Sequence, residues 1–245
     1  MVQPRKVQVD GLLNGRDLGG LPRSRGGDTP RGVFFRSESV DRVSTRGWNS
    51  LHALGVRTVV DLRQDAERRL DASRRPAWLE TVQVDHDGLE NTTFWADHWS
   101  NGRSGTALYY LPHLHAMPER TVAVLHALAA APPGGVLFHC AAGRDRTGLI
   151  AAILLKVADV ELEPIVSDYL ITTTMDVRAT EEVTAGAVCS SFGTTTEQAF
   201  RAAVAGLDVQ PLLTALSPEV RTAILTWRGT LAPEKGQRKP GAEAP

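Results

Sequence analysis

The sequence predicts an α/β fold with a small, mostly parallel central sheet flanked by helices and with extra helices in its C-terminal part. Short β-like runs alternate with helix-like segments in the first part of the chain, and helix-like segments then follow one another. An apolar content of 42% and a charged content of 22% are typical of a chain that buries a core. The 245 residues fit one large domain, which we expect to span residues 1–230.

The first part of the chain supplies most of the expected strands. Ser44 is a typical capping residue, and the helix that it begins is expected to end at Gly55. The charged segment 64–75 is compatible with a second helix. The run 56–61 is predicted to be a buried parallel strand. Shorter β-like runs lie at 33–35 and 81–84.

The middle of the chain is less regular. Residues 88–117 carry aromatic and histidine side chains without clear periodicity, which favours an insertion or a mobile lid. An amphipathic helix, 118–130, begins at a proline, where the missing N–H has no helical partner to lose. The turn 132–135 then leads into a strand at 136–138.

The remainder of the chain is predicted to be helical up to a polar tail. The tail, 231–245, is rich in Pro, Gly, Lys and Glu and is expected to be disordered. The expected helices are 147–157, 164–174, a stretch around 179–188, 196–205 and 218–227.

Charge and cysteine content exclude several classes of protein. A formal net charge of −1 is unlike the basic excess of a nucleic-acid binder. Cys140 and Cys189 are too few for a disulfide framework, which favours a reducing compartment. No apolar run reaches transmembrane length, and the first residues lack the apolar core of a secretory signal. A cytoplasmic location is the default expectation, with export without a cleavable signal as the alternative.

Ten residues carry the chemistry. From His139 to Gly148 the chain reads H-C-A-A-G-R-D-R-T-G, between the expected strand 136–138 and an apolar helix-like run. A strand, a tight loop and a helix start form an oxyanion cradle, because loop N–H groups converge on one point and the helix N-terminus adds partial positive charge. The expected phosphate-binding residues are Ala141, Ala142, Gly143, Arg144, Asp145 and Arg146.

Cys140 is the candidate nucleophile of this cradle. The loop amides, the helix N-terminus and Arg146 would each favour its thiolate, which attacks phosphorus well and later leaves well. Arg146 would hold two phosphate oxygens with its planar guanidinium. Thr147 would hydrogen-bond the sulfur as it leaves, and His139 would orient the loop. Cys189 is interpreted as a small buried apolar residue.

The ten-residue string resembles the active-site loop of the protein tyrosine phosphatase superfamily, and most closely that of the bacterial tyrosine/serine phosphatase family, including its secreted mycobacterial type. Other matches follow in order along residues 12–175. They are N-G-R-D-L-G-G at 14–20, G-V-F-F-R-S at 32–37, L-G-V-R-T-V-V-D-L-R at 54–63 and D-Y-L-I-T at 168–172.

The resemblance implies a phosphatase-like fold and a phosphomonoesterase that forms a phosphocysteine intermediate and needs no cofactor. Its substrate would be a phosphotyrosine protein, with phosphoserine or phosphothreonine proteins and phosphoinositides as alternatives. Two residues depart from the family pattern: Arg144 stands where many relatives have lysine, and Ala141 stands where an aromatic residue is common. Arg144 would bind either a second phosphate or an acidic residue beside a phosphotyrosine.

The general acid is the open assignment. The resemblance implies Asp145, in the loop itself, and its place beside Arg146 agrees with that role. Asp85 and Asp87 follow an expected strand, as the acid does in dual-specificity enzymes, and Asp97 belongs to a W-A-D trio. Asp61, at the end of a strand, is expected to support the loop or Arg146, with a buried ion pair as the alternative.

The same residues argue against a binding module, a sulfur-transfer enzyme or reductase, and a metal site. A phospho-ligand binding module would need a damaged cradle, and this one is intact. Sulfur-transfer loops usually lack the D-R-T-G ending, and a reductase needs a resolving cysteine nearby, whereas Cys189 lies far along the chain. Four histidines invite a metal site, but their spacing includes no ligand pattern for a closed one, so no metal is expected. They are His86, His98, His113 and His115.

Overall fold

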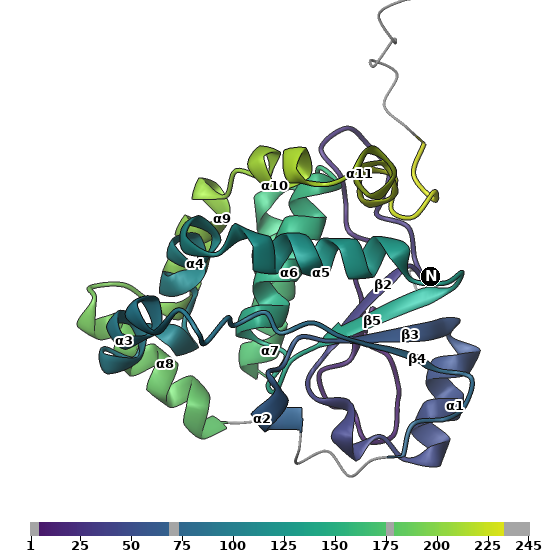
Figure 1. The fold of residues 1–245 in the computed structure, drawn as a ribbon, viewed down its shortest axis with the longest axis horizontal. Coiled ribbons are helices and arrows are strands. Elements are labelled where there is room, and N and C mark those ends of the chain that lie inside the picture. Colours follow the sequence, from purple (N-terminus) through teal and green to yellow (C-terminus); the bar gives the residue numbers. More distant parts are fainter. Residues whose placement is uncertain (1–4, 69–73, 175–178, 233–245) are drawn as a thin grey trace, which may run out of the picture.

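A mixed, mostly parallel sheet forms the centre of the computed structural model, which describes residues 5–68, 74–174 and 179–232. The strand order is β1-β2-β5-β3-β4, and the strands are parallel except for β1, which runs antiparallel to β2 (Figure 1). This confirms the predicted fold class. The strands are β1 (Arg16–Asp17), β2 (Phe34–Ser37), β3 (Val56–Asp61), β4 (Glu80–Gln83) and β5 (Gly135–His139).

The inner strands are apolar on both faces because a layer covers each face. Alternate side chains point to opposite sides of a strand. Phe34, Val60 and Phe138 therefore pack into the larger core, whereas Phe35 and Leu137 pack into the smaller one. Helix α1 lies on the smaller side and the other long helices gather on the opposite side (Figure 1).

Eleven α-helices surround this sheet within the described ranges. Helix α6 is the central one, and nine of its thirteen residues are buried. The helices are α1 (Thr45–Ala53), α2 (Asp65–Arg68), α3 (Thr92–Ser100), α4 (Tyr110–Ala116), α5 (Pro118–Ala130), α6 (Asp145–Val157), α7 (Leu162–Thr174), α8 (Ala179–Ser191), α9 (Thr196–Gly206), α10 (Gln210–Ala215) and α11 (Pro218–Leu225). Three short 3-10 helices, η1 (Val40–Arg42), η2 (Arg103–Gly105) and η3 (Ala107–Tyr109), connect them.

Local signals placed several of these boundaries correctly. The Ser44 side chain accepts a hydrogen bond from the Gly47 N–H at 3.1 Å, which is the predicted cap of α1. Helix α5 begins at Pro118, also as predicted. The expected helix 64–75 is described only over α2, since residues 69–73 lie outside the described part, as does most of the expected tail.

The segment 88–117 is largely helical although its sequence shows no clear periodicity, and its role as an insertion or a mobile lid stays a prediction. Helices α3 and α4 and two 3-10 helices fill it. Their buried faces pack aromatic and histidine rings on one another rather than on the sheet, so the usual apolar periodicity is weak. Trp95 packs at 5.9 Å from Tyr109 and at 6.0 Å from His113, measured between ring centroids.

The sheet brings two loops to the same edge. Asp61, the last residue of β3, pairs in register with His139, the last residue of β5. The loop after β5 leads into α6, and the loop after β3 leads into α2, so these two loops lie side by side (Figure 1). Carboxyl ends of parallel strands are where ligands bind in open α/β sheets.

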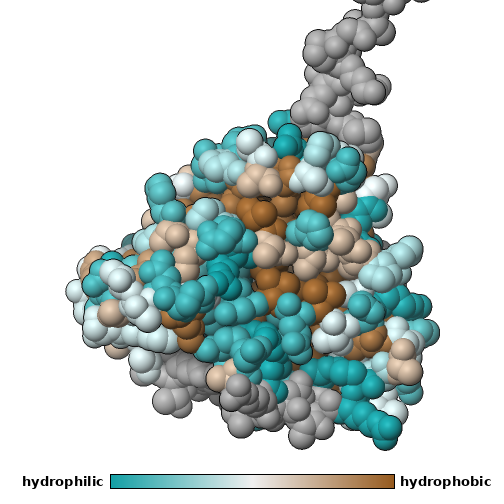
Figure 2. All heavy atoms as spheres, in the orientation of Figure 1, coloured by the Kyte–Doolittle hydropathy of each residue, from teal (hydrophilic) through white to brown (hydrophobic). Residues whose placement is uncertain are grey.

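Surface character gives two further facts. The face in Figure 2 is largely hydrophilic, with an apolar area near its middle where core side chains reach the surface. Across the described ranges, no helix has both the length and the apolar character that crossing a bilayer requires.

Candidate active site

The loop after β5 folds tightly against the end of β2. Cys140 follows β5 directly and is 3% exposed. Gly143 has a φ of +70°, and a Cβ there would lie 2.4 Å from the Ser37 carbonyl oxygen, so both the conformation and the space require glycine. The Ser39 N–H also donates to the Ala141 carbonyl at 2.9 Å. The chain then enters α6 at Asp145.

A pocket of about 260 Å³ opens above this loop. Cys140, Asp145 and Arg146 line its floor, which places three of the predicted catalytic residues in one cavity. The segment 88–117 contributes the aromatic residues Trp95, Trp99 and Tyr109 to the lining. Glu67 and Asp87 complete the polar part of the lining.

Two carboxylates hold the Arg146 guanidinium. Its Nη1 and Nη2 donate to the two carboxylate oxygens of Glu67 at 2.6 and 2.8 Å, and Nη1 also donates to Asp87 Oδ2 at 2.9 Å. Burial opposes the charge of Arg146, but the hydrogen bonds from Glu67 and the nearby Cys140 and Asp87 charges hold its pKa well above the usual range. Burial likewise disfavours the Glu67 charge, but the Arg146 hydrogen bonds keep the pKa of Glu67 below its usual range.

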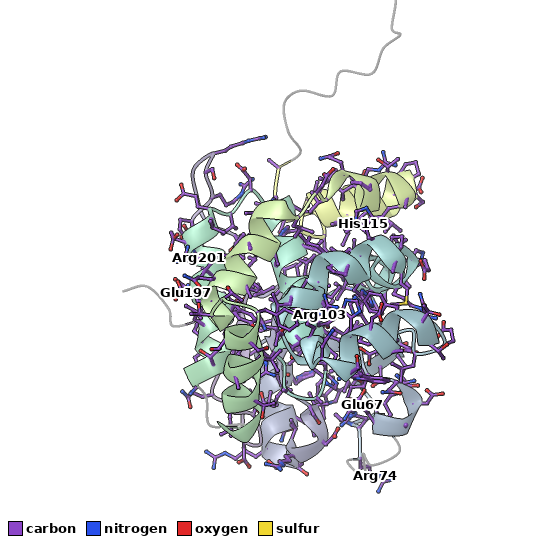
Figure 3. All side chains as sticks on the ribbon, turned by 90° about the vertical axis from the view of Figure 1, so that its left-hand side faces the viewer. Glu67, Arg74, Arg103, His115, Glu197 and Arg201 are labelled. Carbon is purple, nitrogen blue, oxygen red and sulfur yellow. The ribbon has the colours of Figure 1, made fainter. Side chains whose placement is uncertain are left out.

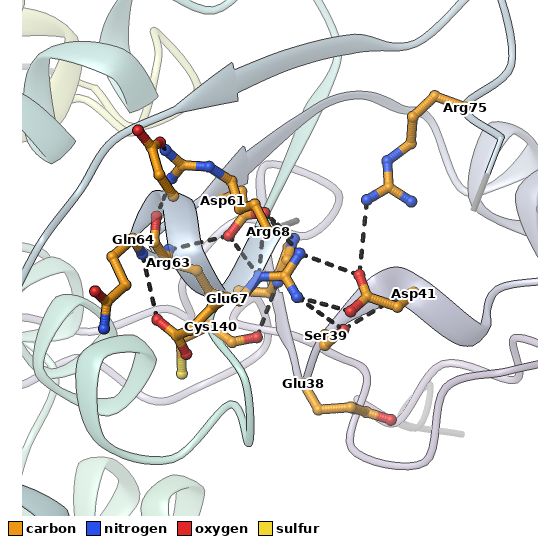
Figure 4. Close-up of polar contacts among 12 residues, drawn as sticks. Glu38, Ser39, Asp41, Asp61, Arg63, Gln64, Glu67, Arg68, Arg75 and Cys140 are labelled. Atoms are coloured by element: carbon orange, nitrogen blue, oxygen red, sulfur yellow. Dashed lines mark hydrogen bonds and ion pairs between the residues drawn. The ribbon is translucent and has the colours of Figure 1, made fainter. Parts of the chain in front are cut away.

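Sequence reasoning missed Glu67. It lies on α2, next to Cys140 in the close-up of Figure 4, and the whole α2 helix sits at the carboxyl edge of the sheet. Figure 3 shows Glu67 far from the Glu197–Arg201 pair on the outer face of α9. The available signal was its position in the first turn of the helix that follows β3, but the charged segment 64–75 resembled a solvent-exposed helix face.

Two of the acid candidates line the pocket, and two do not. Asp145 and Asp87 line it. Asp85 instead accepts hydrogen bonds from the Asp87 and Gly88 N–H groups at 3.0 and 3.4 Å, which braces a turn. Asp97 is exposed on α3 and is not part of the pocket wall.

Asp87 and Asp145 differ in their surroundings. Burial raises the pKa of Asp87 to about 6, although the positive charge of Arg146 opposes the shift. One Asp145 carboxylate oxygen accepts from Arg144 Nε at 3.2 Å, and the other is buried without a hydrogen-bond partner among the described residues.

The residues expected to support the loop form separate contacts. Arg63 donates hydrogen bonds to both carboxylate oxygens of Asp61, including Nε to Oδ1 at 3.0 Å and Nη2 to Oδ2 at 2.8 Å (Figure 4). Arg63 is 3% exposed and also pairs with Asp41, so Asp61 belongs to a buried ion pair. Asp61 Oδ2 also lies 3.8 Å from His139 Nε2, whereas none of the hydrogen bonds among the described residues joins Asp61 to Arg146. Burial would raise the pKa of Asp61, but the Arg63 hydrogen bonds and the neighbouring charges lower it.

His139 directly precedes the cysteine and Thr147 directly follows Arg146, and both are fully buried. His139 Nδ1 is 3.0 Å from the Cys140 carbonyl oxygen, which links its ring to the loop. Burial lowers the pKa of His139, which favours the neutral ring. The Thr147 hydroxyl is buried and makes no hydrogen bond to the Cys140 sulfur or to any other described group, so the expected bond to sulfur is absent from this structure.

The Arg144 side chain is held between the loop and the segment 88–117. Its Nη2 donates to the Gly105 carbonyl at 3.1 Å and its Nε to Asp145, and the side chain is 8% exposed. The guanidinium therefore ties the loop to the segment 88–117. Binding of a second phosphate, or of an acidic residue beside a phosphotyrosine, stays a prediction for Arg144.

The four histidines do not converge on a metal site. The rings of His86 and His113 stack at 4.8 Å between centroids, and His86 Nε2 lies 3.1 Å from the Thr121 hydroxyl. His98 Nδ1 lies 2.8 Å from the Phe94 carbonyl. Among the described residues, no three or more His, Cys, Asp or Glu side chains are placed to hold a metal ion.

Comparison with known proteins agrees with this arrangement. A model of the Tyrosine phosphatase family matches residues 7–212. A Tyrosine-protein phosphatase of Nostoc commune is 32% identical over 152 residues, which cover 61% of this chain and 51% of that protein. The Triple specificity protein phosphatase PtpB of Mycobacterium tuberculosis is 30% identical over 168 residues, which cover 57% of this chain and 60% of that protein. The chain thus spans little more than half the length of these relatives.

Solved structures show more distant likeness. The P. aeruginosa TpbA in complex with pTyr covers 86% of this chain and 96% of its own, at 18% identity and a TM-score of 0.42. The match to the core catalytic domain of the S. cerevisiae PP-IP phosphatase SIW14 covers 84% of this chain and 91% of that one, at 13% identity and a TM-score of 0.43.

Proposed function

The chain belongs to the tyrosine phosphatase family, and from that premise we propose that it hydrolyses phosphomonoesters, above all phosphotyrosine in proteins, through a phosphocysteine intermediate. The observation that carries the proposal is the pocket in which Cys140 and Arg146 meet at the turn from β5 into α6. A nucleophile and a guanidinium at one helix N-terminus suit a phosphate dianion.

The first step transfers the phosphoryl group to sulfur. The Cys140 thiolate attacks phosphorus, an S–P bond forms, and the P–O bond to the tyrosine oxygen breaks. Asp145 gives its proton to that leaving oxygen, so the phenol departs neutral. The loop N–H groups and Arg146 stabilise the charge on the non-bridging oxygens.

The second step regenerates the enzyme. Water attacks phosphorus, and the Asp145 carboxylate takes one of its protons as the new P–O bond forms. The S–P bond breaks, Cys140 leaves as thiolate, and inorganic phosphate departs. Asp145 is then protonated again for the next cycle.

Asp145 is the proposed acid because it lines the pocket floor beside Cys140 and keeps one carboxylate oxygen without a hydrogen-bond partner among the described residues. Among the described residues only Arg144 bonds to this carboxylate, at Oδ2, so Oδ1 is available to the leaving group. Asp87 also lines the pocket, and its raised pKa suits an acid, but its carboxylate is bonded to Arg146. Asp87 is therefore the alternative that the leaving-group experiment in the Discussion tests.

An aromatic substrate fits the aromatic wall of the pocket. Trp95, Trp99 and Tyr109 face the pocket, and Trp99 is 55% exposed at its rim. Aromatic rings attract one another beyond their area of contact by about 0.5–1.5 kcal/mol. The phosphoinositide alternative has no such support, since the Arg144 side chain is turned to Gly105.

Turnover of p-nitrophenyl phosphate tests the proposal. Cys140→Ser should abolish turnover, whereas Cys189→Ser, the matched change at a buried cysteine outside the pocket, should keep it. Activity should survive EDTA and be lost to vanadate, which resembles the transition state, and to peroxide, which oxidises a thiolate. Residual turnover by a folded Cys140→Ser protein, or sulfur transfer from thiosulfate instead of hydrolysis, would overturn the proposal.

A further inference from the structure

Four charged residues form a buried cluster behind the pocket, called here the Asp168 cluster: Arg5, Arg16, Arg36 and Asp168. Arg16 Nε lies 3.0 Å from Asp168 Oδ1, and Arg36 Nη1 lies 2.7 Å from Oδ2. Arg5 pairs with Oδ1 as well. Arg16, Arg36 and Asp168 are each 1% exposed, and none of the four lines the pocket. The motifs at 14–20, 32–37 and 168–172 therefore meet here without entering the chemistry described above.

Arg36 connects this cluster to the cysteine loop. Its Nη2 donates to the Gly143 carbonyl oxygen at 2.7 Å, while Nη1 remains on Asp168. One planar guanidinium thus bridges a carboxylate on α7 and a carbonyl of the loop. Its two donors point in fixed directions, which a flexible single ammonium group does not reproduce.

The end of β2 holds the loop at a second carbonyl too. The Ser39 N–H donates to the Ala141 carbonyl at 2.9 Å. Gly143 lies so close that a Cβ would meet Ser37 and Glu38 backbone atoms at 2.4 and 2.6 Å. The Ala141 and Gly143 carbonyls are therefore both directed toward β2.

In a trans peptide the N–H points opposite to the C=O. Holding the Gly143 carbonyl toward Arg36 consequently directs the Arg144 N–H away from Arg36, and holding the Ala141 carbonyl directs the Ala142 N–H away from β2. Loop N–H groups that all point to one side make an anion-binding concavity.

Building on the proposed function, we infer that Arg36 is a positioning residue for the phosphate-binding loop, which it holds through the Gly143 carbonyl so that the Arg144 N–H faces the bound phosphoryl group. Asp168 fixes the other end of the same guanidinium. The three arginines also exceed the single carboxylate in charge, so the cluster leaves positive potential behind a loop that binds dianions.

Asp168 keeps this arrangement charged over a wide pH range. Burial would raise the pKa of Asp168, but the charges of Arg16, Arg36 and Arg5 hold it well below its usual range. The partner of Arg36 is therefore ionised at neutral pH.

Arg16 supplies a matched control. It is as buried as Arg36. Its Nε donates to the same Asp168 carboxylate at 3.0 Å, and its Nη2 donates to the Asp168 backbone carbonyl at 2.8 Å. Its other hydrogen bonds go to Asp168 Oδ2, Asn14 and Thr172, and among the described residues none reaches the loop. A purely structural role for the cluster would make Arg16 and Arg36 equivalent.

The test compares Arg36→Lys with Arg16→Lys in the full-length chain. Inhibition by orthovanadate and by inorganic phosphate measures anion binding, and the pH midpoint of Cys140 alkylation by iodoacetamide measures loop electrostatics. Thermal unfolding reports the structural effect of each change. Because one ammonium does not replace the bridging fork, Arg36→Lys should weaken both inhibitors about 10-fold and raise the alkylation midpoint by about half a pH unit. Arg16→Lys should change both inhibition constants by less than about twofold and leave the alkylation midpoint nearly unchanged. The two replacements should lower Tm by similar amounts.

Equal effects of the two replacements on anion binding and alkylation, or none for Arg36→Lys, would overturn the inference. Alkylation needs no turnover, so a selective shift with Arg36→Lys supports the positioning role even in a protein whose phosphatase activity had been disproved. If Arg36→Lys does not fold, Arg36→Gln is measured against Arg16→Gln in trimethylamine N-oxide, which favours the compact state, with the same criteria.

Discussion

Glu67 and Arg146 form a two-pronged ion pair inside the pocket, with N–O distances of 2.6 and 2.8 Å. Glu67 takes the Nη1–Nη2 edge of the guanidinium, and Asp87 takes the second proton of Nη1. Within the described residues, Nε and the second Nη2 proton of Arg146 donate to no other group, which leaves an adjacent pair of donors for a phosphate. The ion pair therefore orients Arg146 without using the donors that the proposed mechanism needs.

Replacing Glu67 by glutamine should reduce activity by loosening Arg146. The neutral side chain keeps the shape but loses charge-assisted hydrogen bonds of about 1.5–3 kcal/mol each, and misplacement of a clamping residue by about 1 Å costs on the order of 100-fold. We expect kcat/KM for p-nitrophenyl phosphate to fall by about 10- to 100-fold. Asp65→Asn, on the same short helix but away from the pocket, is the control and should stay near wild type. An unchanged or faster Glu67→Gln enzyme would show that Glu67 competes with phosphate for Arg146.

The identity of the acid should appear in the response to the leaving group. An alkyl phosphate needs a proton on its departing oxygen, whereas p-nitrophenolate leaves with little help. Asp145→Asn should slow an alkyl phosphate by about 10²- to 10⁴-fold and p-nitrophenyl phosphate by less than about 10-fold. Equal slowing of both substrates would assign Asp145 to bracing the loop. The same selectivity in Asp87→Asn instead would move the acid role to Asp87.

Asp87 should make the protein less stable as the pH rises. Burial raises its pKa from 3.8 to about 6 in the folded state, so between these values the folded state binds more protons than the unfolded state. The free energy of unfolding therefore falls as the pH rises from about 4 to about 6. Asp87→Asn removes this penalty and should gain on the order of 1–3 kcal/mol at pH 7.5 but little at pH 4.

Urea unfolding at the two pH values measures this difference. Asp97→Asn, at an exposed carboxyl of α3, should leave the stability at both values near wild type. A variant Asp87→Asn protein that is less stable than wild type at pH 7.5 would show that the Arg146 ion pair outweighs the burial of the carboxyl.

The sequence predicted the sheet and the long helices because their signals are local. Residues 56–61 place valines on both faces, and Ser44 and Pro118 mark helix starts. Strand β1 was missed because two residues carry no periodicity, and α10 because it is only six residues long. The helices of the segment 88–117 were not predicted because their apolar periodicity is weak.

The loop residues of the site were also predictable, since Cys140 through Arg146 are contiguous and lie between a strand and a helix. Glu67 and the aromatic wall were not, because they come from distant segments that only the fold brings to the same pocket. The side-chain direction of Arg144 depends on the carbonyl of Gly105, on a segment whose structure the sequence did not reveal.

Trp99 should favour aryl over alkyl phosphates. Its side chain is 55% exposed at the rim of the pocket that contains Cys140, and it packs at 5.3 Å from Trp95 between ring centroids. A phenyl ring entering the pocket would contact it, whereas a serine side chain is too short. An aromatic contact of about 0.5–1.5 kcal/mol corresponds to about 2- to 13-fold in affinity.

Trp99→Ala should therefore raise KM for a phosphotyrosine peptide by about 2- to 13-fold and leave that for the matched phosphoserine peptide within about twofold. Trp99→Phe should restore most of the preference, because a ring is kept. Phe192→Ala controls for loss of an exposed aromatic residue, since Phe192 is 46% exposed and does not line the pocket. If Trp99→Ala affects both peptides alike, the indole acts by supporting α3 rather than by contacting the substrate ring, and the aromatic wall loses its part in substrate choice.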